Sequence, residues 1–254
     1  MAALGLGSYS TTSLVFLVVT AFVAGLARGF SGFGSAMIFM PLASAVVGAR
    51  VASPLLLLID FTSSLALIPG AWRRADRRDV SIMSIGALIG VPLGTAALAF
   101  GDPLAIRWGL VVLIVALLAL MMSGWRYPGR PTVPATIAVG GVAGFFGSLA
   151  QVAGPPIVLY WLRDAAVAAV TRANIILYFA IADVLIVLSY FIGGLWTPAI
   201  LGLAVITGPL FGVGLWIGSK LFGKASDDAF RRICYALIAA SALLSLPLFD
   251  GVFR

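Results

Sequence analysis

Histidine and glutamate are absent from this chain of 254 residues, and cysteine occurs once, as Cys234. A chain without histidine and with a single thiol cannot build the imidazole and thiolate clusters that hold zinc, nor an internal disulfide. Acid–base chemistry is left to nine acidic residues, all of them aspartate. We therefore expect neither a metal nor another cofactor, and the scarcity of acid–base groups argues against an enzyme.

Charge is also scarce. Charged residues make up 10% of the chain and hydrophobic residues 62%, with a mean hydropathy of +1.14. A water-soluble domain could not bury so much apolar surface. Uncharged stretches such as residues 184–219 fit helices of about 20 residues that cross a hydrocarbon core of about 30 Å. The sequence predicts an all-α, polytopic integral membrane protein, located in the cell (inner) membrane.

Basic residues outnumber acidic ones, and the net charge is +7. In a membrane protein this excess serves topology, because cytoplasmic loops retain lysine and arginine, so we expect no nucleic-acid partner. The basic cluster at residues 73–78 has the composition of a topogenic loop that also touches anionic membrane lipid. The chain begins without a basic region, which predicts that no signal peptide is cleaved.

Glycine, proline and charge divide the chain into ten apolar segments. We place them near residues 11–28, 34–48, 51–71, 80–100, 103–123, 133–149, 155–163, 170–192, 197–221 and 229–248. The second and the seventh are short for a full crossing. Segments 1–2 and 6–7 are therefore each either a hairpin that enters and leaves on one face or a single broken crossing.

The distribution of arginine and lysine distinguishes these alternatives. If each broken pair adds two crossings or none, twelve basic residues share one side of the membrane: Arg73, Arg74, Arg77, Arg78, Arg126, Arg130, Arg163, Arg172, Lys220, Lys224, Arg231 and Arg232. Three then lie on the other side: Arg50, Arg107 and Arg254. If each pair is one crossing, the split is eight against seven, which is no bias. The positive-inside rule favours the first arrangement and places both termini outside the cytoplasm.

The two halves of the chain, residues 1–127 and 133–254, resemble each other. Residues 24–34 resemble residues 143–154 with one residue inserted, and further matches follow in the same order: Arg50 with Arg172, Asp60 close to Asp183, Pro92 with Pro209, and Asp102 and Arg107 with Asp227 and Arg232. With five segments in each half, the halves would have opposite orientations in the membrane. This predicts two membrane repeats in inverted topology, with glycine-broken helices or hairpins, that together make one transport domain.

Both halves carry a glycine-rich segment followed by an apolar run with proline. In the first half it runs from Gly29-Phe-Ser-Gly-Phe-Gly34 to Pro41, and in the second from Gly144 to Gly154-Pro-Pro. On these motifs the chain resembles, over essentially its whole length, the TauE/SafE sulfite exporter family. The resemblance implies transport of sulfite, of organosulfonates such as sulfoacetate, or of related small sulfur-containing anions.

Arg28 ends a run of 27 residues without a charge, within the first glycine-rich segment. An arginine at membrane depth costs roughly 3 kcal/mol or more unless it is paired or lines a wet cavity. Helices that begin near Gly34 and Gly154 would point unpaired N–H groups at an anion, and the guanidinium adds planar donors. We expect side chains close to the two breaks to complete this substrate site: Ser31, Ser35, Ser148 and Gln151. Alternatively, the glycines only allow close helix packing and Arg28 reaches an interface.

A second group of polar residues lies on the eighth segment. Asn174 and Tyr178 are one helical turn apart and, with Arg172, supply further donors for the anion; the alternative is that they pack helices together. Asp60 and Asp183 fall near the middle of segments 3 and 8, where a carboxylate is paired, protonated or functional. They either couple anion movement to protons, exchange salt-bridge partners between states, or only join helices.

The leading hypothesis is a secondary transporter that exports a small sulfur-containing anion by alternating access, with proton coupling as one mechanism. An uptake permease and a passive anion channel would use the same polar residues and stay open as alternatives. An intramembrane enzyme acting on lipid headgroups fits least, since only aspartates are available. A single chain with two repeats can enclose one pathway, so a homodimer is compatible with the sequence but not required by it.

Overall fold

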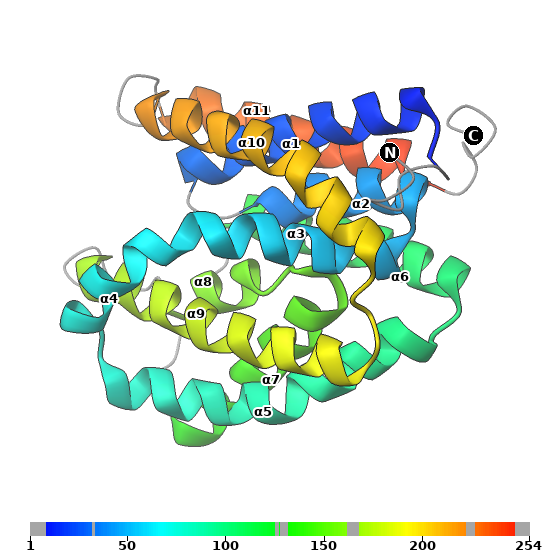
Figure 1. Ribbon diagram of the computed structural model, residues 1–254. Helices are drawn as coiled ribbons and strands as arrows, with labels where there is room; N and C mark the ends of the chain where they lie inside the picture. Colours follow the sequence, from blue (N-terminus) through cyan, green and yellow to red (C-terminus); the bar gives the residue numbers. More distant parts are fainter. Residues whose placement is uncertain are drawn as a thin grey trace. The chain divides into compact units, whose positions relative to one another are not determined.

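The computed structural model describes residues 9–31, 34–124, 127, 132–161, 168–221 and 227–246, apart from the side chains of residues 31, 66, 168–169 and 227–233 (Figure 1). All regular structure in these ranges is helical. The elements are α1 (Thr11–Ser31), α2 (Ser35–Val47), α3 (Ala49–Ser64), the short 3-10 helix η3 (Leu65–Leu67), α4 (Ile68–Arg74), α5 (Arg77–Phe100), α6 (Pro103–Met122), α7 (Val133–Ala150), α8 (Gly154–Trp161), α9 (Ala168–Ile192), α10 (Pro198–Leu221) and α11 (Asp227–Leu244).

Six of the described helices are long and apolar enough to cross a membrane: α1, α5, α6, α7, α9 and α10. The bent pair of α3 and α4 makes a seventh span if it is counted as one. α2 has 13 residues and α8 has 8, lengths of about 20 Å and about 12 Å that fall short of a hydrocarbon core. The prediction of an all-α, multi-pass membrane protein is confirmed, and the two segments expected to be short are short.

The third segment, expected only as one apolar stretch over residues 51–71, is broken. Its two helices, α3 and α4, meet at a bend of 70° around η3. Pro69 stands in the first turn of α4, where it offers no N–H and its ring would clash with the Leu65 carbonyl of a continuous helix. Ser63 and Ser64 precede the bend, and serine hydroxyls compete with a helix for backbone partners.

The chain divides into two compact units, and neither unit is one half of the sequence. Unit 1 contains residues 1–59, 101–119 and 195–254, and unit 2 contains residues 60–100 and 120–194. Each unit therefore combines helices from before and after the midpoint of the chain. The repeats at residues 1–127 and 133–254 are a division of the sequence, and their inverted orientation stays a prediction.

In unit 1, α1 packs against α10 through glycines (Figure 1). Gly25 and Gly29 on α1 approach the carbonyls of Phe211 and Leu215 on α10, so closely that a Cβ added at Gly29 would lie 2.0 Å from the Leu215 oxygen. Spacings of four residues put these glycines on one face of the helix. Gly29 thus serves helix packing, as one of the two interpretations of the glycine-rich segment predicted.

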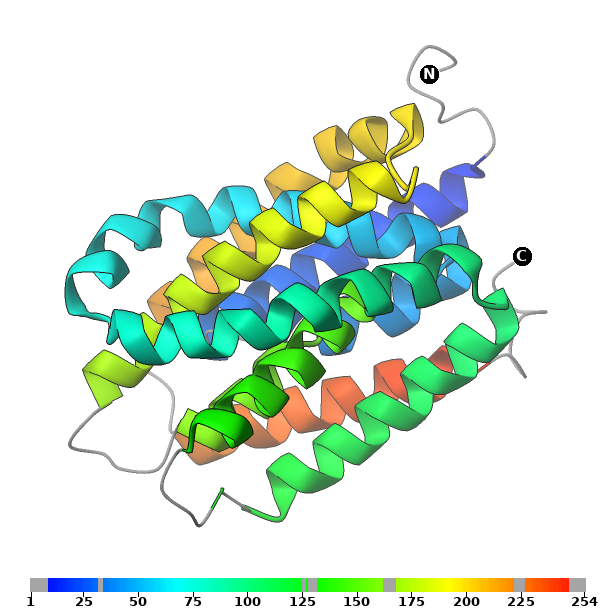
Figure 2. The same cartoon turned by 90° about the horizontal axis from the view of Figure 1, so that it is seen from below.

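Unit 2 uses the same kind of contact between α5 and α7, while α9 packs against α4 and α5 (Figure 2). Gly86 and Gly90 on α5 approach the carbonyls of Ile137 and Gly141 on α7, where an added Cβ would lie 2.0 Å from either oxygen. Small residues let two backbones approach closely in a membrane, where lipid solvates large apolar side chains as well as a protein does. Each unit therefore contains a glycine-lined pair of long helices, one from each half of the chain.

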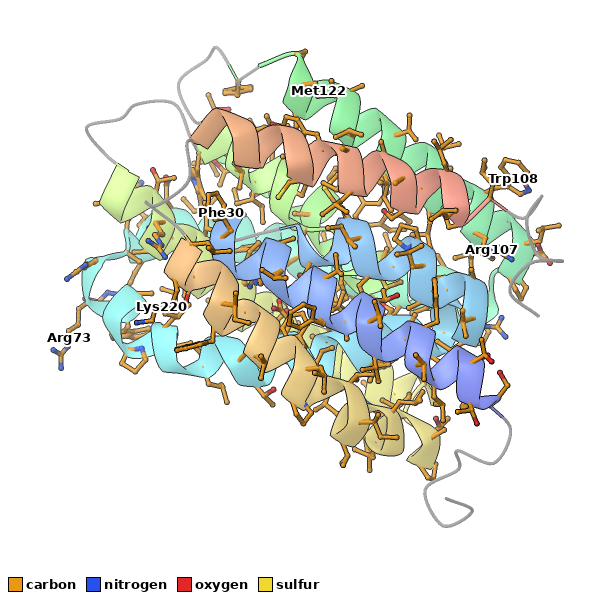
Figure 3. All side chains as sticks on the ribbon, turned by 90° about the horizontal axis from the view of Figure 1, so that it is seen from above. Phe30, Arg73, Arg107, Trp108, Met122 and Lys220 are labelled. Atoms are coloured by element: carbon orange, nitrogen blue, oxygen red, sulfur yellow. The ribbon has the colours of Figure 1, made fainter. Side chains whose placement is uncertain are left out.

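α7 and α8 form a hairpin and not a single broken crossing. The Thr136 hydroxyl near the start of α7 lies 2.7 Å from the Tyr160 hydroxyl near the end of α8. Beside them, the Tyr127 N–H donates to the Leu159 carbonyl over 3.1 Å. The chain therefore returns to the level at which it entered, which is the arrangement that the positive-inside rule favours. In unit 1, α2 likewise turns back beside α1 and packs against α11 (Figures 1 and 3).

A proline inside α2 leaves a backbone carbonyl without its helical hydrogen-bond donor, and a side chain of α11 supplies one. Pro41 has no N–H to offer the Met37 carbonyl four residues before it. The hydroxyl of the buried Ser241 on α11 lies 3.1 Å from this carbonyl oxygen and 2.8 Å from the Ile238 carbonyl of its own helix, so its one proton is shared between the two. The serine thereby replaces part of a lost helical bond, which a backbone acceptor inside a membrane requires.

Candidate functional site

The residues expected to bind substrate fall into both units. Unit 1 contains Arg28, Ser31, Gly34 and Ser35. Unit 2 contains Asp60, Ser148, Gln151, Gly154, Arg172, Asn174, Tyr178 and Asp183. The geometry of each group is described within its own unit.

The break between α1 and α2 is shaped by Gly34, whose φ of 102° lies in the left-handed region that favours glycine. α2 begins at the next residue, Ser35, and no side chain caps its first turn. Residues 35–38 are all buried. The start of α2 therefore presents backbone N–H groups, with the positive end of the helix dipole, inside the protein.

Arg28 lies in the last turn of α1 and is half-buried. The candidate span runs from Thr11 to Phe30, so the arginine stands near the end of a crossing helix and not at its middle. Figure 3 shows Phe30 at the same end of the α1–α10 pair as Lys220. A cation here is stabilised by the helix dipole and costs less than one at the membrane centre. Arg28 therefore has a structural reason for its charge, and anion binding stays a prediction.

Ser31 is the last residue of α1, and its side chain lies outside the described part of the structure. Its expected contact with the anion consequently stays a prediction. Ser35, by contrast, is placed in the first turn of α2 and is 5% exposed. A hydroxyl there lies close to the N–H groups of the same turn, where an anion would bind.

The break between α7 and α8 is closed by backbone bonds. Gln151 adopts the left-handed conformation with φ 59°, and its N–H donates to the Gly147 carbonyl over 2.7 Å. The Gln151 bond and its left-handed conformation form an αL-type end to α7, and the Val152 N–H adds a bond to the Phe146 carbonyl over 3.2 Å. The Gln151 side-chain amide lies 3.4 Å from the Tyr190 hydroxyl on α9, a long contact. Gln151 thus ends a helix and is joined only weakly to α9.

The start of α8 offers fewer donors than the start of α2. α8 begins at Gly154, and its next two residues are Pro155 and Pro156, which have no N–H. Proline suits the first turn of a helix for this reason, but it removes two of the groups that would hold an anion. The first turn of α2 contains no proline. Of the two expected helix N-termini, that of α2 therefore has more N–H groups in its first turn.

Ser148 is fully buried on α7, and its hydroxyl donates to the Val91 carbonyl on α5 over 2.9 Å. The Tyr190 hydroxyl on α9 donates to the Ser148 carbonyl. A serine has a single hydroxyl proton, and here a backbone acceptor takes it. Ser148 joins three helices, and as an anion ligand it would first have to give up the bond to α5.

On α9, the structure brings two of the three expected ligands together. Asn174 and Tyr178 are both buried, and Arg172 is exposed. The Asn174 Oδ1 accepts from the Asp76 N–H over 2.7 Å, and the Tyr178 hydroxyl donates to the Gly140 carbonyl over 3.0 Å. Asn174 therefore joins α9 to the connection between α4 and α5, and Tyr178 joins it to α7, which is the packing role expected as the alternative. Ligand roles for all three residues stay predictions.

Asp60 and Asp183 occupy helices of unit 2. Asp60 stands on α3 shortly before the bend at η3, and Asp183 stands near the middle of α9. Both side chains are half-buried. Among the described residues, no group of three or more histidine, cysteine or acidic side chains could hold a metal ion.

Two residues with polar tips were not identified from the sequence. Tyr190 connects α9 to the end of α7, and Trp161 ends α8 with its side chain buried. The available signal was general: a tyrosine or tryptophan inside an apolar helix usually needs a partner for its O–H or N–H. The sequence contains six residues of each type, so this signal does not select these two.

Comparison with known proteins adds independent information. The family model described as "Sulfite exporter TauE/SafE" matches residues 17–245, which include both breaks. A relative from Cupriavidus necator, named "Probable sulfite/organosulfonate exporter TauE", is 27% identical over 228 residues, covering 85% of this chain and 88% of its own length. No solved structure matches the chain.

Proposed function

Because this chain belongs to the TauE/SafE sulfite exporter family, a family of transporters and not of enzymes, we propose that it exports a small sulfur-containing anion by alternating access. The proposed substrate is an organosulfonate such as sulfoacetate, or sulfite. The protein would work in the cell membrane with both termini outside the cytoplasm and its basic loops inside.

The observation that carries the proposal is the geometry of the α1–α2 break. Residues 35–38 at the start of α2 are buried, and Gly34 has no side chain that could cap their N–H groups. Helix N-termini bind phosphate and sulfate through such groups and through about half a positive charge. Arg28, in the last turn of α1, adds a full charge on the other side of the same break. A sulfonate or sulfite presents several oxygens to these donors.

A competition series tests the substrate class. Purified protein in proteoliposomes is given labelled sulfoacetate, with unlabelled sulfite, acetate or phosphate as competitor. We expect sulfite to compete strongly and acetate weakly, because a planar carboxylate presents fewer oxygens to a helix N-terminus than a sulfur oxyanion does. Equal competition by acetate would contradict the assignment to sulfur-containing anions.

Coupling to protons is assigned to Asp60 and Asp183. A carboxylate within a membrane-spanning segment is retained when it is paired or takes up protons. Asp60→Asn and Asp183→Asn keep the shape and remove the titratable group. We expect these variants to exchange sulfoacetate but no longer to concentrate it in response to a pH gradient. Asp102→Asn is the matched control, because Asp102 is exposed and caps α6, a role that asparagine also fills.

A variant of Asp60 or Asp183 that still responds fully to the gradient would remove that residue from coupling. If both variants respond, the alternative roles as salt-bridge partners or helix contacts would apply. The same vesicles distinguish an uptake permease from an exporter by the direction of the pH gradient. A gradient of one direction drives accumulation of sulfoacetate, and the opposite gradient drives its release.

A further inference from the structure

Trp161, the last residue of α8, carries a buried polar group without a partner. Its side chain is 7% exposed, and its indole Nε1 has no hydrogen-bond partner in the described part of the chain. A buried donor in this condition has lost its bond to water and gained none in return. Such a group calls for an explanation, because most buried polar atoms in proteins are satisfied.

Two buried hydroxyls, those of Ser44 and Thr95, also lack a partner among the described residues, but they are easier to explain. Each stands inside a helix, where rotation about χ1 brings such a hydroxyl to the carbonyl four residues earlier. An indole N–H lies at the far edge of a rigid ring and cannot reach its own helix in this way. The Arg107 Nε is a fourth such atom, but its guanidinium is already held by the bond from Nη2 to the Ser245 carbonyl. Trp161 is therefore the most informative of the four.

The end of α8 is held in place on two sides. The Tyr160 hydroxyl pairs with the Thr136 hydroxyl on α7 over 2.7 Å. The Trp161 ring meets the Tyr178 ring on α9 edge-to-face, with centroids 6.5 Å apart. Tyr178 is itself fixed by its bond to the Gly140 carbonyl. The hydrogen bond between Tyr160 and Thr136 thus holds the end of α8 against α7, while a ring contact joins Trp161 to α9.

The helix face opposite Trp161 supplies a further donor. Asn174 lies one turn before Tyr178 on α9 and is 4% exposed. Its bond to the Asp76 N–H uses the amide oxygen, so its two N–H groups are not engaged by that bond. Arg172 is exposed on the same helix, two residues before Asn174. Its charge would raise the local concentration of anions.

We propose that the Trp161 Nε1–H donates to an oxygen of a small organosulfonate during transport, with the rings of Trp161 and Tyr178 against its carbon atoms. This assignment rests on the proposed function. A bond from a neutral donor to a charged sulfonate is stronger than one between neutral groups. Because Nε1 is closed to water in this structure, the substrate reaches it in a state in which the end of α8 and α9 have separated. Alternating access provides such a state.

Trp161→Phe tests the proposal, because phenylalanine keeps an aromatic ring beside Tyr178 and removes the N–H together with part of the indole ring. We expect the KM for sulfoacetate counterflow to rise roughly ten-fold or more, as the loss of a hydrogen bond to a charged group predicts. Because the smaller ring leaves a cavity, the unfolding temperature should fall modestly, and KM, which does not depend on the amount of folded protein, is the readout. Trp216→Phe is the matched control, because Trp216 is 61% exposed on α10, and it should change neither quantity.

An unchanged KM would overturn the proposal, and so would a KM that rises only in parallel with a loss of folded protein. A binding titration separates this inference from the proposed function. The other five of the six tryptophans are replaced by phenylalanine, and sulfoacetate is added to the detergent-solubilised variant. A saturable change in emission supports the contact with Trp161, and the absence of any change overturns it. If wild-type protein moved no sulfur oxyanion, the proposed function would fail, and the titration would still decide the inference.

Discussion

Ser148, Asn174 and Tyr178 each use a side-chain hydrogen-bonding group on the backbone of a neighbouring segment. These bonds fasten α7 and α9 within unit 2, and they occupy groups that the sequence offered as anion ligands. Arg28 differs in kind, because its position in the last turn of α1 places a permanent charge next to the α1–α2 break. At the residue scale, Arg28 is consequently the side chain whose replacement discriminates best between binding and packing.

Arg28→Ala should lower kcat/KM for sulfoacetate by about ten-fold or more, the loss expected when a charge-assisted bond to an oxyanion is removed. The kcat/KM of Arg28→Lys should lie between those of the wild type and Arg28→Ala, because lysine keeps the charge and loses the planar set of donors. Transport is measured in proteoliposomes after the amount of folded protein has been matched. Arg73→Ala is the control, since Arg73 is exposed, and it should transport like the wild type.

Wild-type transport by Arg28→Ala would show that Arg28 only complements the dipole of α1. A variant that inserts poorly but transports normally per folded molecule would lead to the same conclusion. Either result would leave the helix N-terminus of α2 as the remaining candidate for the anion site in unit 1.

At the scale of elements, close helix pairs depend on glycine. Gly29→Ala should destabilise the protein by about 1–3 kcal/mol, because the new Cβ would lie 2.0 Å from the Leu215 oxygen and push α10 away from α1. Gly212→Ala is the matched control on α10, where nothing lies within 4 Å of an added Cβ. It should be neutral or slightly stabilising, since alanine favours a helix. Thermal unfolding in detergent measures the stability of both variants. Equal stabilities of Gly29→Ala and Gly212→Ala would contradict the close contact between Gly29 and Leu215.

The bond from Ser241 to the Met37 carbonyl is a second test at this scale. Ser241→Ala should cost about 1 kcal/mol, because it leaves a buried carbonyl without a partner. In a Pro41→Ala background the cost should shrink, since residue 41 then supplies the N–H that the carbonyl lacks. The unfolding temperatures of the wild type, the two single variants and the double variant give the coupling between Ser241 and Pro41. Additive effects would show that the serine and the proline act independently.

Much of the element order follows from the sequence alone. α10 at Pro198–Leu221 and α6 at Pro103–Met122 agree with the expected segments to within a residue or two, because charge and proline mark helix ends in an apolar chain. The bend between α3 and α4 was missed, although Pro69 stands beside it, since proline inside a helix does not always break it; α5 continues through Pro92. Proline therefore limits a helix only where its neighbours also favour a break.

The sequence alone does not predict which helices pack against each other. A single sequence shows that α1 and α5 have small faces, but not that α1 packs against α10 and α5 against α7. The candidate site is equally hard to predict, because in the sequence Ser148 and Gln151 are both simply polar residues near a glycine break. Whether such a side chain is available to an anion depends on the carbonyl opposite, which for Ser148 is that of Val91, and this is a property of the packed structure.

At the scale of the whole molecule, the division of basic residues predicts which ends face the cytoplasm. Figure 3 shows Lys220 and Arg107 at opposite ends of unit 1, as that division requires. In a Cys234→Ser parent, Asp102→Cys should react with a membrane-impermeant thiol reagent on intact cells. Arg73→Cys should react only after the cells are permeabilised. Labelling of Arg73→Cys from outside would reverse or refute the proposed topology.

The most direct test of the central claim is counterflow of labelled sulfoacetate into proteoliposomes preloaded with unlabelled sulfoacetate. A carrier exchanges the two across an alternating site, so we predict a transient, saturable accumulation of label above its external concentration, and sulfite inside or outside should reduce it. A channel only lets the label equilibrate. Label that reaches equilibrium without this overshoot, or that does not enter at all, would contradict a carrier for small sulfur-containing anions.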